Sequence, residues 1–322
     1  MTTSLSDLPG EFALIARHFR PLAGPGAFSL TDDAAVFAPP AGRELVIAAD
    51  AMVAGVHFLP DDPPDLVGRK LLRTNLSDLA AMGASPFGYL MTVSAPRDTP
   101  DAWFAGFAAG LAADQAEFSI FLLGGDTTST PGPISLSLTI LGHVAPGCAL
   151  RRAGARDGDG LWVSGSIGDG ALGLLAARGE IDDPDGTLAD RYRLPRPRLA
   201  LGQAVVGIVH AGMDVSDGLV QDTGHLCRAG GLGAVIEAAE VPLSPAARAA
   251  GRLALCLIGG DDYELLLAVP PAAGPALAEA AARTGTPVTR IGEFRAGAPG
   301  VTVRAADGTT LRLAAGGWSH FA

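Results

Sequence analysis

The chain has 322 residues, and 48% of them are hydrophobic, which is enough to fill the cores of two domains of ordinary size. Its formal net charge of −11 repels the phosphates of nucleic acids and anionic membranes, so neither is expected as a partner. The three cysteines form no CxxC pair, and the N-terminus carries no targeting signal, so we expect a cytoplasmic protein with reduced thiols.

Strands and helices are expected to alternate in the first half of the chain. The spacing of apolar residues predicts strands over 44–49, 118–123 and 134–144 and helices over 65–83 and 102–116. The first two strands end beside Asp50 and Asp126, so both carboxylates would lie at the C-terminal ends of buried strands.

The second half shows the same mixture. Strands are expected over 161–164, 234–237 and 264–269, and helices over 171–178 and 276–284. Pro146-Gly147 and the turn-rich run over 156–160 interrupt the pattern, which predicts an N-terminal domain over 1–147 and a C-terminal domain over 148–322. Each domain would have a mixed α/β fold, with a sheet packed against helices.

Aspartates in unusual contexts are the most informative feature of the sequence. They lie beside glycine, serine or apolar residues, at Asp32, Asp33, Asp50, Asp78, Asp126, Asp214 and Asp217. An ordinary role as a turn or helix-cap residue remains open for Asp32, Asp33, Asp126 and Asp217. Asp78 lies within an apolar helical segment, where burial of its charge is costly unless a metal offsets it.

The aspartates favour magnesium over zinc. Mg²⁺ prefers oxygen ligands and usually bridges a few carboxylates to substrate phosphates, whereas zinc sites use clusters of Cys and His. Lys70 is the only lysine, and it does not belong to a GxxxxGK[ST] motif. If the chain handles nucleotides, it is therefore not a P-loop enzyme, and several Mg²⁺ ions could replace the missing lysine in phosphoryl transfer.

The segment over 212–218 (GMDVSDG) directly precedes a predicted helix that begins near Leu219. This places backbone amides, the hydroxyl of Ser216 and the carboxylates of Asp214 and Asp217 near a helix N-terminus. The amides would bind phosphate and the carboxylates would bind metal.

Nine motifs follow one another along the chain: GEFALIARHF (10–19), DD (32–33), VAGVHF (53–58), NLSDLAAMGA (75–84), GGDTT (124–128), ALRRAG (149–154), MDVSDGL (213–219), GGDDYEL (259–265) and GGWSHF (316–321). Together they resemble the thiamine-monophosphate kinase family over nearly the whole chain. GGDTT and DVSDGL also occur in the wider superfamily of aminoimidazole-ribotide and selenophosphate synthetases. The resemblance is narrowed to the thiamine-monophosphate kinase family by NLSDLAAMGA, VAGVHF and the aromatic C-terminus.

The resemblance implies the two-domain fold of aminoimidazole-ribotide synthetase and direct transfer of phosphate from ATP to thiamine phosphate. It also implies a homodimer that pairs through its N-terminal domains, with ATP and Mg²⁺ near that interface and the C-terminal domain completing the nucleotide and substrate site.

Site residues are carried over by position. The implied metal ligands are Asp33, Asp50, Asp78, Asp126, Asp214 and Asp217, with Asp32 as a neighbour. The implied ATP contacts are Gly125, Asp126, Arg152 and Ser216. The implied thiamine phosphate contacts are His57, Asp261 and Trp318, for which a packed histidine, a turn carboxylate and a terminal anchor are the alternatives.

Four positions depart from the family pattern. Ala48-Ala49 replace Ser/Thr hydroxyls, Thr31 replaces a glycine, and Asp261 replaces a glutamate. None of these changes removes a metal carboxylate. Ala49 leaves only its backbone carbonyl for a cation, and Asp261 is one methylene shorter, so its direct contact with substrate stays open.

Two other functions remain as alternatives. One is a different ATP-dependent synthetase of the same superfamily, of the aminoimidazole-ribotide synthetase kind. A selenophosphate synthetase would carry a reactive cysteine near the N-terminus, whereas the first cysteine here is Cys148. The other is a non-catalytic protein that binds nucleotide or divalent cations. Turnover with thiamine phosphate separates this last alternative from a kinase.

Overall fold

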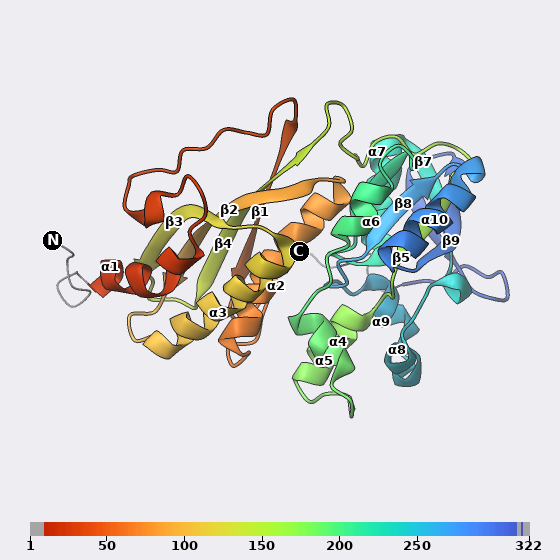
Figure 1. Cartoon of the computed structure of the whole chain (residues 1–322). Helices are drawn as coiled ribbons and strands as arrows, with labels where there is room; N and C mark the ends of the chain where they lie inside the picture. Colours follow the sequence, from red (N-terminus) through yellow and green to blue (C-terminus); the bar gives the residue numbers. More distant parts are fainter. Residues whose placement is uncertain (1–9, 314–316, 318–322) are drawn as a thin grey trace. The chain divides into compact units, whose positions relative to one another are not determined.

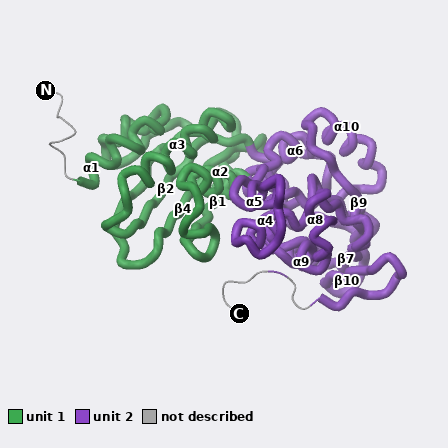
Figure 2. Tube along the Cα trace, turned by 90° about the horizontal axis from the view of Figure 1, so that it is seen from below, with its two compact units in different colours: residues 1–76, 85–146 green, residues 77–84, 147–322 purple. Residues whose placement is uncertain are grey.

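The computed structural model describes residues 10–313 and residue 317. Two compact units divide the chain (Figure 2). Unit 1 comprises residues 1–76 and 85–146, and unit 2 comprises residues 77–84 and 147–322. The short segment 77–84 thus belongs with the second unit, although it lies in the first half of the sequence.

Unit 1 is built on a mixed sheet. Within the described residues it has four strands in the order β1-β4-β2-β3, formed by β1 (Glu44–Val53), β2 (Ser85–Ala95), β3 (Leu122–Ser129) and β4 (Ser135–Val144). Only β2 and β3 pair in parallel; β4 is antiparallel to β1 and β2. The sheet therefore places residues of distant segments in register.

Two long helices, α2 (Pro64–Ala81) and α3 (Asp101–Phe118), cover one face of this sheet (Figure 1). Leu136, Leu138 and Ile140 of β4 are fully buried, and they alternate with half-buried Ser137 and Thr139. This alternation places the polar residues on the face opposite the helices.

Short helical turns precede the sheet. They are α1 (Gly10–Leu14), the π-helical turn η2 (Ile15–Phe19) and the 3₁₀ turns η3 (Arg20–Leu22) and η4 (Phe28–Leu30).

Two predictions for unit 1 were wrong. Residues 118–123 do not form a strand, because α3 continues to Phe118 and ends at Ser119 in the left-handed conformation, and β3 begins only at Leu122. Asp50 does not end its strand, because β1 stays paired with β4 as far as Val53. Both aspartates predicted to follow strands, Asp50 and Asp126, therefore lie within them.

Unit 2 contains a larger mixed sheet. Its six strands within the described residues have the order β10-β7-β9-β5-β8-β6. They are β5 (Gly160–Ser164), β6 (Ala211–Asp214), β7 (Leu232–Glu237), β8 (Leu265–Val269), β9 (Val288–Ala296) and β10 (Gly300–Arg304). The three strands predicted in this half are confirmed to within one or two residues.

Helices surround this sheet (Figure 1). They are α4 (Asp169–Ala177), α5 (Thr187–Arg193), α6 (Leu199–Ala204), α7 (Leu219–Gly230), α8 (Pro245–Ala250), α9 (Leu253–Ile258) and α10 (Gly274–Thr284), with the 3₁₀ turns η5 (Ala238–Glu240) and η6 (Pro271–Ala273). The two helices predicted here, over 171–178 and 276–284, correspond to α4 and α10.

The core of unit 2 positions one functional loop. Leu161 of β5, Leu266 of β8 and Leu226 of α7 are fully buried in a single hydrophobic cluster. Because β6 ends at Asp214 and α7 begins at Leu219, residues 215–218 connect a buried strand directly to a helix whose first residue is fully buried. Both units thus have the predicted mixed α/β architecture.

Within residues 10–313, no helix is long and apolar enough to cross a membrane.

Candidate active site

A cavity of about 680 Å³ lies on the helix-free face of the unit 1 sheet. The strands contribute Thr92, Ser137 and Thr139 to its lining, and the chain before β1 contributes another part of the wall. Four of the predicted site residues line this one cavity: Asp32, Asp33, Gly125 and Asp126.

Gly125 explains how Asp126 reaches the cavity. A Cβ atom added at Gly125 would lie 1.7 Å from the carbonyl oxygen of Met91, so only glycine lets β3 approach β2 this closely. The resulting register places Asp126 opposite Thr92. Asp126 is exposed, and its Oδ1 accepts a hydrogen bond from the backbone N–H of Thr127 over 2.9 Å.

The donor chemistry of this cavity fits Mg²⁺. Among the described residues that line it, the polar side chains are aspartates and hydroxyls, and there is neither lysine nor arginine. Carboxylate and hydroxyl oxygens are the hard ligands that Mg²⁺ prefers. A cation would also offset the repulsion between the three aspartates.

Asp50 and Ala49 are placed differently. Neither is among the residues that line the cavity. The backbone N–H of Asp50 donates to Oδ1 of Asn75 on α2 over 3.1 Å, and Ala49 pairs with Thr139 of β4. The structure therefore brings three of the predicted unit 1 carboxylates together and leaves Asp50 outside their cavity.

His57 closes the turn that follows β1. Its Nδ1 accepts the backbone N–H of Val53 over 3.0 Å, and its carbonyl oxygen accepts a hydrogen bond from Nζ of Lys70 over 2.9 Å. These two hydrogen bonds give the half-buried His57 a structural role in the turn. They favour the structural alternative for His57 over contact with substrate.

In unit 2, Asp214 ends β6 and is 5% exposed. Its Oδ2 accepts a hydrogen bond from the hydroxyl of Ser77 over 2.7 Å. Burial raises the pKa of Asp214, whereas the Ser77 hydrogen bond and the charge of Arg152 lower it and the charge of Asp217 raises it further. The charges of Arg152 and Asp217 thus act on the Asp214 carboxyl in opposite directions.

Asp78 follows Ser77 on the same turn of α2 and is half-buried. It belongs to the segment that groups with unit 2. The Ser77 hydrogen bond brings this part of α2 to Asp214. Trp318, the remaining predicted residue, lies outside the described residues.

The loop over 215–218 carries Ser216 and Asp217, both half-buried. The carbonyl oxygen of Ser216 accepts the backbone N–H of Asp261 over 2.9 Å. Asp261 has a φ of +67°, an uncommon conformation for a residue other than glycine. The structure thus places Asp261, predicted to bind substrate, next to the loop predicted to bind ATP.

The backbone amides of this loop, which were predicted to bind phosphate, already have a hydrogen-bond acceptor. The backbone N–H groups of Ser216, Asp217 and Gly218 all donate to Oδ2 of Asp222, each over 3.1 Å. The helix begins where predicted, but a side chain from its own first turn already occupies the amides. Asp222 was not among the predicted site residues, although an aspartate soon after SDG was a usable signal.

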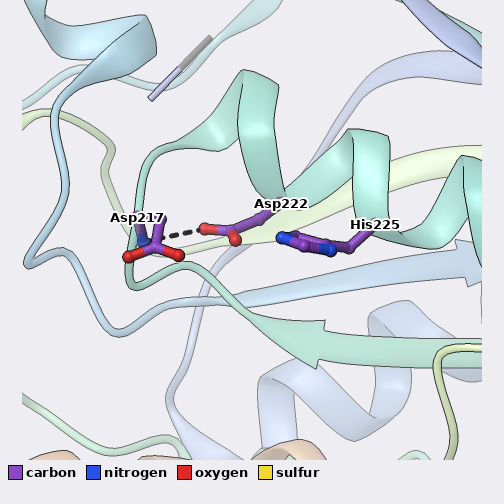
Figure 3. A group of neighbouring side chains, drawn as sticks. All are labelled: Asp217, Asp222 and His225. Atoms are coloured by element: carbon purple, nitrogen blue, oxygen red, sulfur yellow. Dashed lines mark hydrogen bonds between the residues drawn. The ribbon is translucent and has the colours of Figure 1, made fainter. Parts of the chain in front are cut away.

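Asp217, Asp222 and His225 form a cluster of potential metal ligands (Figure 3), whose ligand atoms lie within 4.8 Å of one another. His225 weakens this possibility. Its Nδ1 lies 3.0 Å from Nη2 of Arg228, and because a guanidinium only donates, Nδ1 must accept and the neutral ring carries its proton on Nε2. Burial and the charge of Arg228 lower the pKa of His225.

Asp222 itself is almost fully buried, at 1% exposure. Burial raises the pKa of its carboxyl to about 7, and the nearby charges of Asp214 and Asp217 raise it as well, against the lowering effect of the amide hydrogen bonds. Because one oxygen of Asp222 is engaged by three amides and Nδ1 of His225 is engaged by Arg228, the geometry favours a structural role for Asp222 over metal ligation.

Comparison with known proteins agrees with this architecture. Residues 31–144 match the model of the AIR synthase related protein N-terminal domain, and residues 156–304 match that of the corresponding C-terminal domain. A thiamine-monophosphate kinase of Caulobacter vibrioides is 48% identical over 325 aligned residues, which cover 97% of this chain and 91% of that protein. The chain belongs to the thiamine-monophosphate kinase family.

Solved structures support membership of the thiamine-monophosphate kinase family. The thiamine-monophosphate kinase of Stenotrophomonas maltophilia K279a has 38% identity and a TM-score of 0.83, covering 94% of this chain and 98% of its own. A structure described as AaThiL complexed with AMPPCP and TMP has 29% identity and a TM-score of 0.77 over the full length of both chains. The predicted family resemblance and fold class are thereby confirmed.

Proposed function

We propose that this protein catalyses the ATP-dependent phosphorylation of thiamine phosphate to thiamine diphosphate. The observation that carries the proposal is the match over 97% of the chain to a thiamine-monophosphate kinase at 48% identity. The related structure that holds AMPPCP and TMP supports the same pair of substrates. In the reaction, a phosphate oxygen of thiamine phosphate bonds to the γ-phosphorus of ATP, the bond to the β,γ-bridging oxygen breaks, and ADP leaves.

Mg²⁺ is proposed as the metal cofactor, in several ions. The cavity carboxylates Asp32, Asp33 and Asp126 would hold it in unit 1. Asp50 and the Ala49 carbonyl lie on β1 outside the lining of that cavity, and only the family resemblance supports them as ligands. When bound, Mg²⁺ neutralises the charge of the transferring phosphates. Asp78, Asp214 and Asp217 are the proposed ligands in unit 2. The hydrogen bond from Ser77 fixes the orientation of the Asp214 carboxylate.

ATP contacts are proposed for Gly125 and Asp126 in unit 1 and for Arg152 and Ser216 in unit 2. A guanidinium matches phosphate oxygens with two parallel donors, and the charge of Arg152 acts on Asp214 and His225. Because Asp222 occupies the amides beside Ser216, a phosphate there would be bound by side chains.

Thiamine phosphate is proposed to contact Asp261 and Trp318. Tyr263 donates its hydroxyl hydrogen to Oδ1 of Asp261 over 3.1 Å, which orients the carboxylate beside the Ser216 loop. His57 remains the weakest of the proposed substrate contacts, because its ring already closes the turn after β1.

A homodimer in the cytoplasm completes the proposal. On the unit 1 sheet, the exposed fractions of Leu45, Ile47 and Leu90 are 41%, 62% and 42%. The pairing of β1 and β2 with β4 places all three side chains on the sheet face that carries Thr139. Exposed apolar side chains clustered on one face are typical of subunit contacts. Light scattering should give a dimeric mass, and Ile47→Asp should shift it to that of a monomer.

The experiment that tests the function supplies ATP and Mg²⁺ with either thiamine phosphate or thiamine. We expect thiamine diphosphate and equimolar ADP from thiamine phosphate only, because thiamine lacks the attacking phosphate oxygen. Chelation of Mg²⁺ should abolish turnover. Binding of ATP without any turnover of thiamine phosphate would instead favour the non-catalytic alternative, and AMP as the nucleotide product would also refute the proposal.

A further inference from the structure

We propose that Asp222 is a positioning residue for the nucleotide, which holds residues 216–218 in the conformation that presents Ser216 and Asp217 to Mg²⁺ and ATP. The inference rests on the proposed function, because it assumes that this loop serves the nucleotide. Asp222 would act through the loop and would touch neither substrate nor metal.

One carboxylate oxygen carries the first part of the argument. Oδ2 of Asp222 accepts hydrogen bonds from three consecutive backbone N–H groups, those of Ser216, Asp217 and Gly218, each over 3.1 Å. Three donors can converge on one oxygen only when the backbone curls around it. The Asp222 carboxylate is therefore a template for the loop, and Figure 3 shows it beside the backbone of Asp217.

The opposite side of the loop is held by the chain before β8. The carbonyl oxygens of Val215 and Ser216 accept the backbone N–H groups of Tyr263 and Asp261, over 2.8 and 2.9 Å. Gly218 lies so close to Ile258 that an added Cβ would be 2.5 Å from its carbonyl oxygen. The loop backbone is thus fixed on both sides. The side chains of Ser216 and Asp217 are half-buried, and Oδ2 of Asp217 accepts a hydrogen bond from Nε2 of Gln221 over 3.2 Å.

Charge distinguishes this role from simple filling of space. Oxygens of the Asp217 and Asp222 carboxylates lie within 4.8 Å of each other, so their negative charges repel. A carboxylate at position 222 costs free energy that an apolar side chain would avoid. In return, the Asp222 carboxylate provides a hydrogen-bond acceptor for the three backbone amides. An asparagine would keep an acceptor oxygen for the amides and remove the repulsion.

Three variants test the inference: Asp222→Ala, Asp222→Asn and the control Asp183→Ala. Asp183 has the same chemistry elsewhere in unit 2, where its carboxylate accepts the backbone N–H groups of Leu188 and Ala189 at the start of α5. Calorimetry measures the Kd of AMPPCP with Mg²⁺, and hydrogen exchange with mass spectrometry follows the peptide that contains 215–218. Neither readout requires turnover.

We expect Asp222→Ala to raise the Kd for AMPPCP with Mg²⁺ at least tenfold and to speed exchange in the loop. Asp222→Asn should stay within about threefold of wild type, and Asp183→Ala should leave both loop exchange and Kd unchanged.

The inference is overturned if Asp222→Ala binds AMPPCP like wild type, if Asp222→Asn is as weak as Asp222→Ala, or if the wild type does not bind AMPPCP. Failure of the proposed function is recognised separately, as AMPPCP binding by a wild-type protein that does not phosphorylate thiamine phosphate.

Discussion

The hydroxyl of Ser77 donates a 2.7 Å hydrogen bond to Oδ2 of Asp214, and both residues are buried. Ser77 lies near the end of α2 and Asp214 lies at the end of β6, 137 positions later in the chain. This bond ties the short segment 77–84 to the sheet of unit 2. It also fixes one of the carboxylates proposed to bind Mg²⁺.

Ser77→Ala should lower both stability and activity. Loss of the hydroxyl leaves a buried carboxylate oxygen without this partner, which costs about 1–3 kcal/mol in the free energy of unfolding. Because the Asp214 carboxylate would also lose its orientation, the Mg²⁺ concentration for half-maximal rate should rise.

The matched control for this variant is Ser244→Ala. The hydroxyl of Ser244 donates to Oδ1 of Asp169 over 2.6 Å and also caps α8, and neither residue is a proposed metal ligand. Its loss should lower the free energy of unfolding by about 0.5–2 kcal/mol without changing the Mg²⁺ dependence. Equal Mg²⁺ dependence of the two variants would argue against a metal role for Asp214.

Asp126→Asn should fold like wild type and lose most activity. The amide keeps the shape of the side chain and removes the charge that would hold Mg²⁺ in the unit 1 cavity. Excess Mg²⁺ should recover part of the rate. Asp98→Asn, at an exposed position outside the cavity lining, is the control and should behave like wild type. A wild-type rate for Asp126→Asn at limiting Mg²⁺ would remove Asp126 from the metal site.

Gly125→Ala should destabilise unit 1 severely. The new Cβ would lie 1.7 Å from the Met91 carbonyl oxygen, a backbone atom that cannot move without separating β2 from β3. The cost should exceed about 3 kcal/mol, the upper end of ordinary overpacking. Gly132→Ala is the control, since an added Cβ there meets nothing closer than 3.6 Å. Similar denaturation midpoints for the two variants would contradict the described strand packing.

Cys256 should resist alkylation in the folded protein. Burial raises the pKa of its thiol to about 11, so at pH 8 only about a thousandth is the reactive thiolate. From pH 8 towards pH 11 that fraction should rise about tenfold per pH unit, whereas in urea the rise should level off near the ordinary value of 9. Peptide mass spectrometry after iodoacetamide treatment should find partly exposed Cys148 labelled first. Equal labelling of Cys148 and Cys256 at pH 8 without urea would show that Cys256 is accessible.

Local patterns predicted the elements well where the apolar period was uninterrupted. The helix over 65–83 corresponds to α2, and its Gly83 has the left-handed φ of +68° expected of a C-cap residue. The predicted strand end was wrong where pairing with a neighbouring strand determines how far the strand extends. Nothing local extends β1 past Asp50, but β4 offers a partner residue as far as Val53. Strand ends set by a distant partner cannot be derived from a single segment.

The candidate site was likewise predicted in part from local motifs. Sequence motifs identified Asp32, Asp33 and Asp126, and the structure gathers them around one cavity. The occupied amides at 216–218 were not foreseen, because the motif alone does not reveal where the Asp222 carboxylate turns. A side chain in the first turn of a helix can cap its own N-terminus or face away from it, and its surroundings decide between these options.

The most direct test of the central claim follows the phosphate itself. Purified protein is incubated with ATP labelled in the γ-phosphate, Mg²⁺ and thiamine phosphate, and the products are separated. We predict that the label appears in the terminal phosphate of thiamine diphosphate in a one-to-one ratio with ADP, and that Asp126→Asn transfers far less. Label recovered only as free phosphate, or remaining in ATP while the wild-type protein binds nucleotide, would contradict the claim that this chain is a thiamine phosphate kinase.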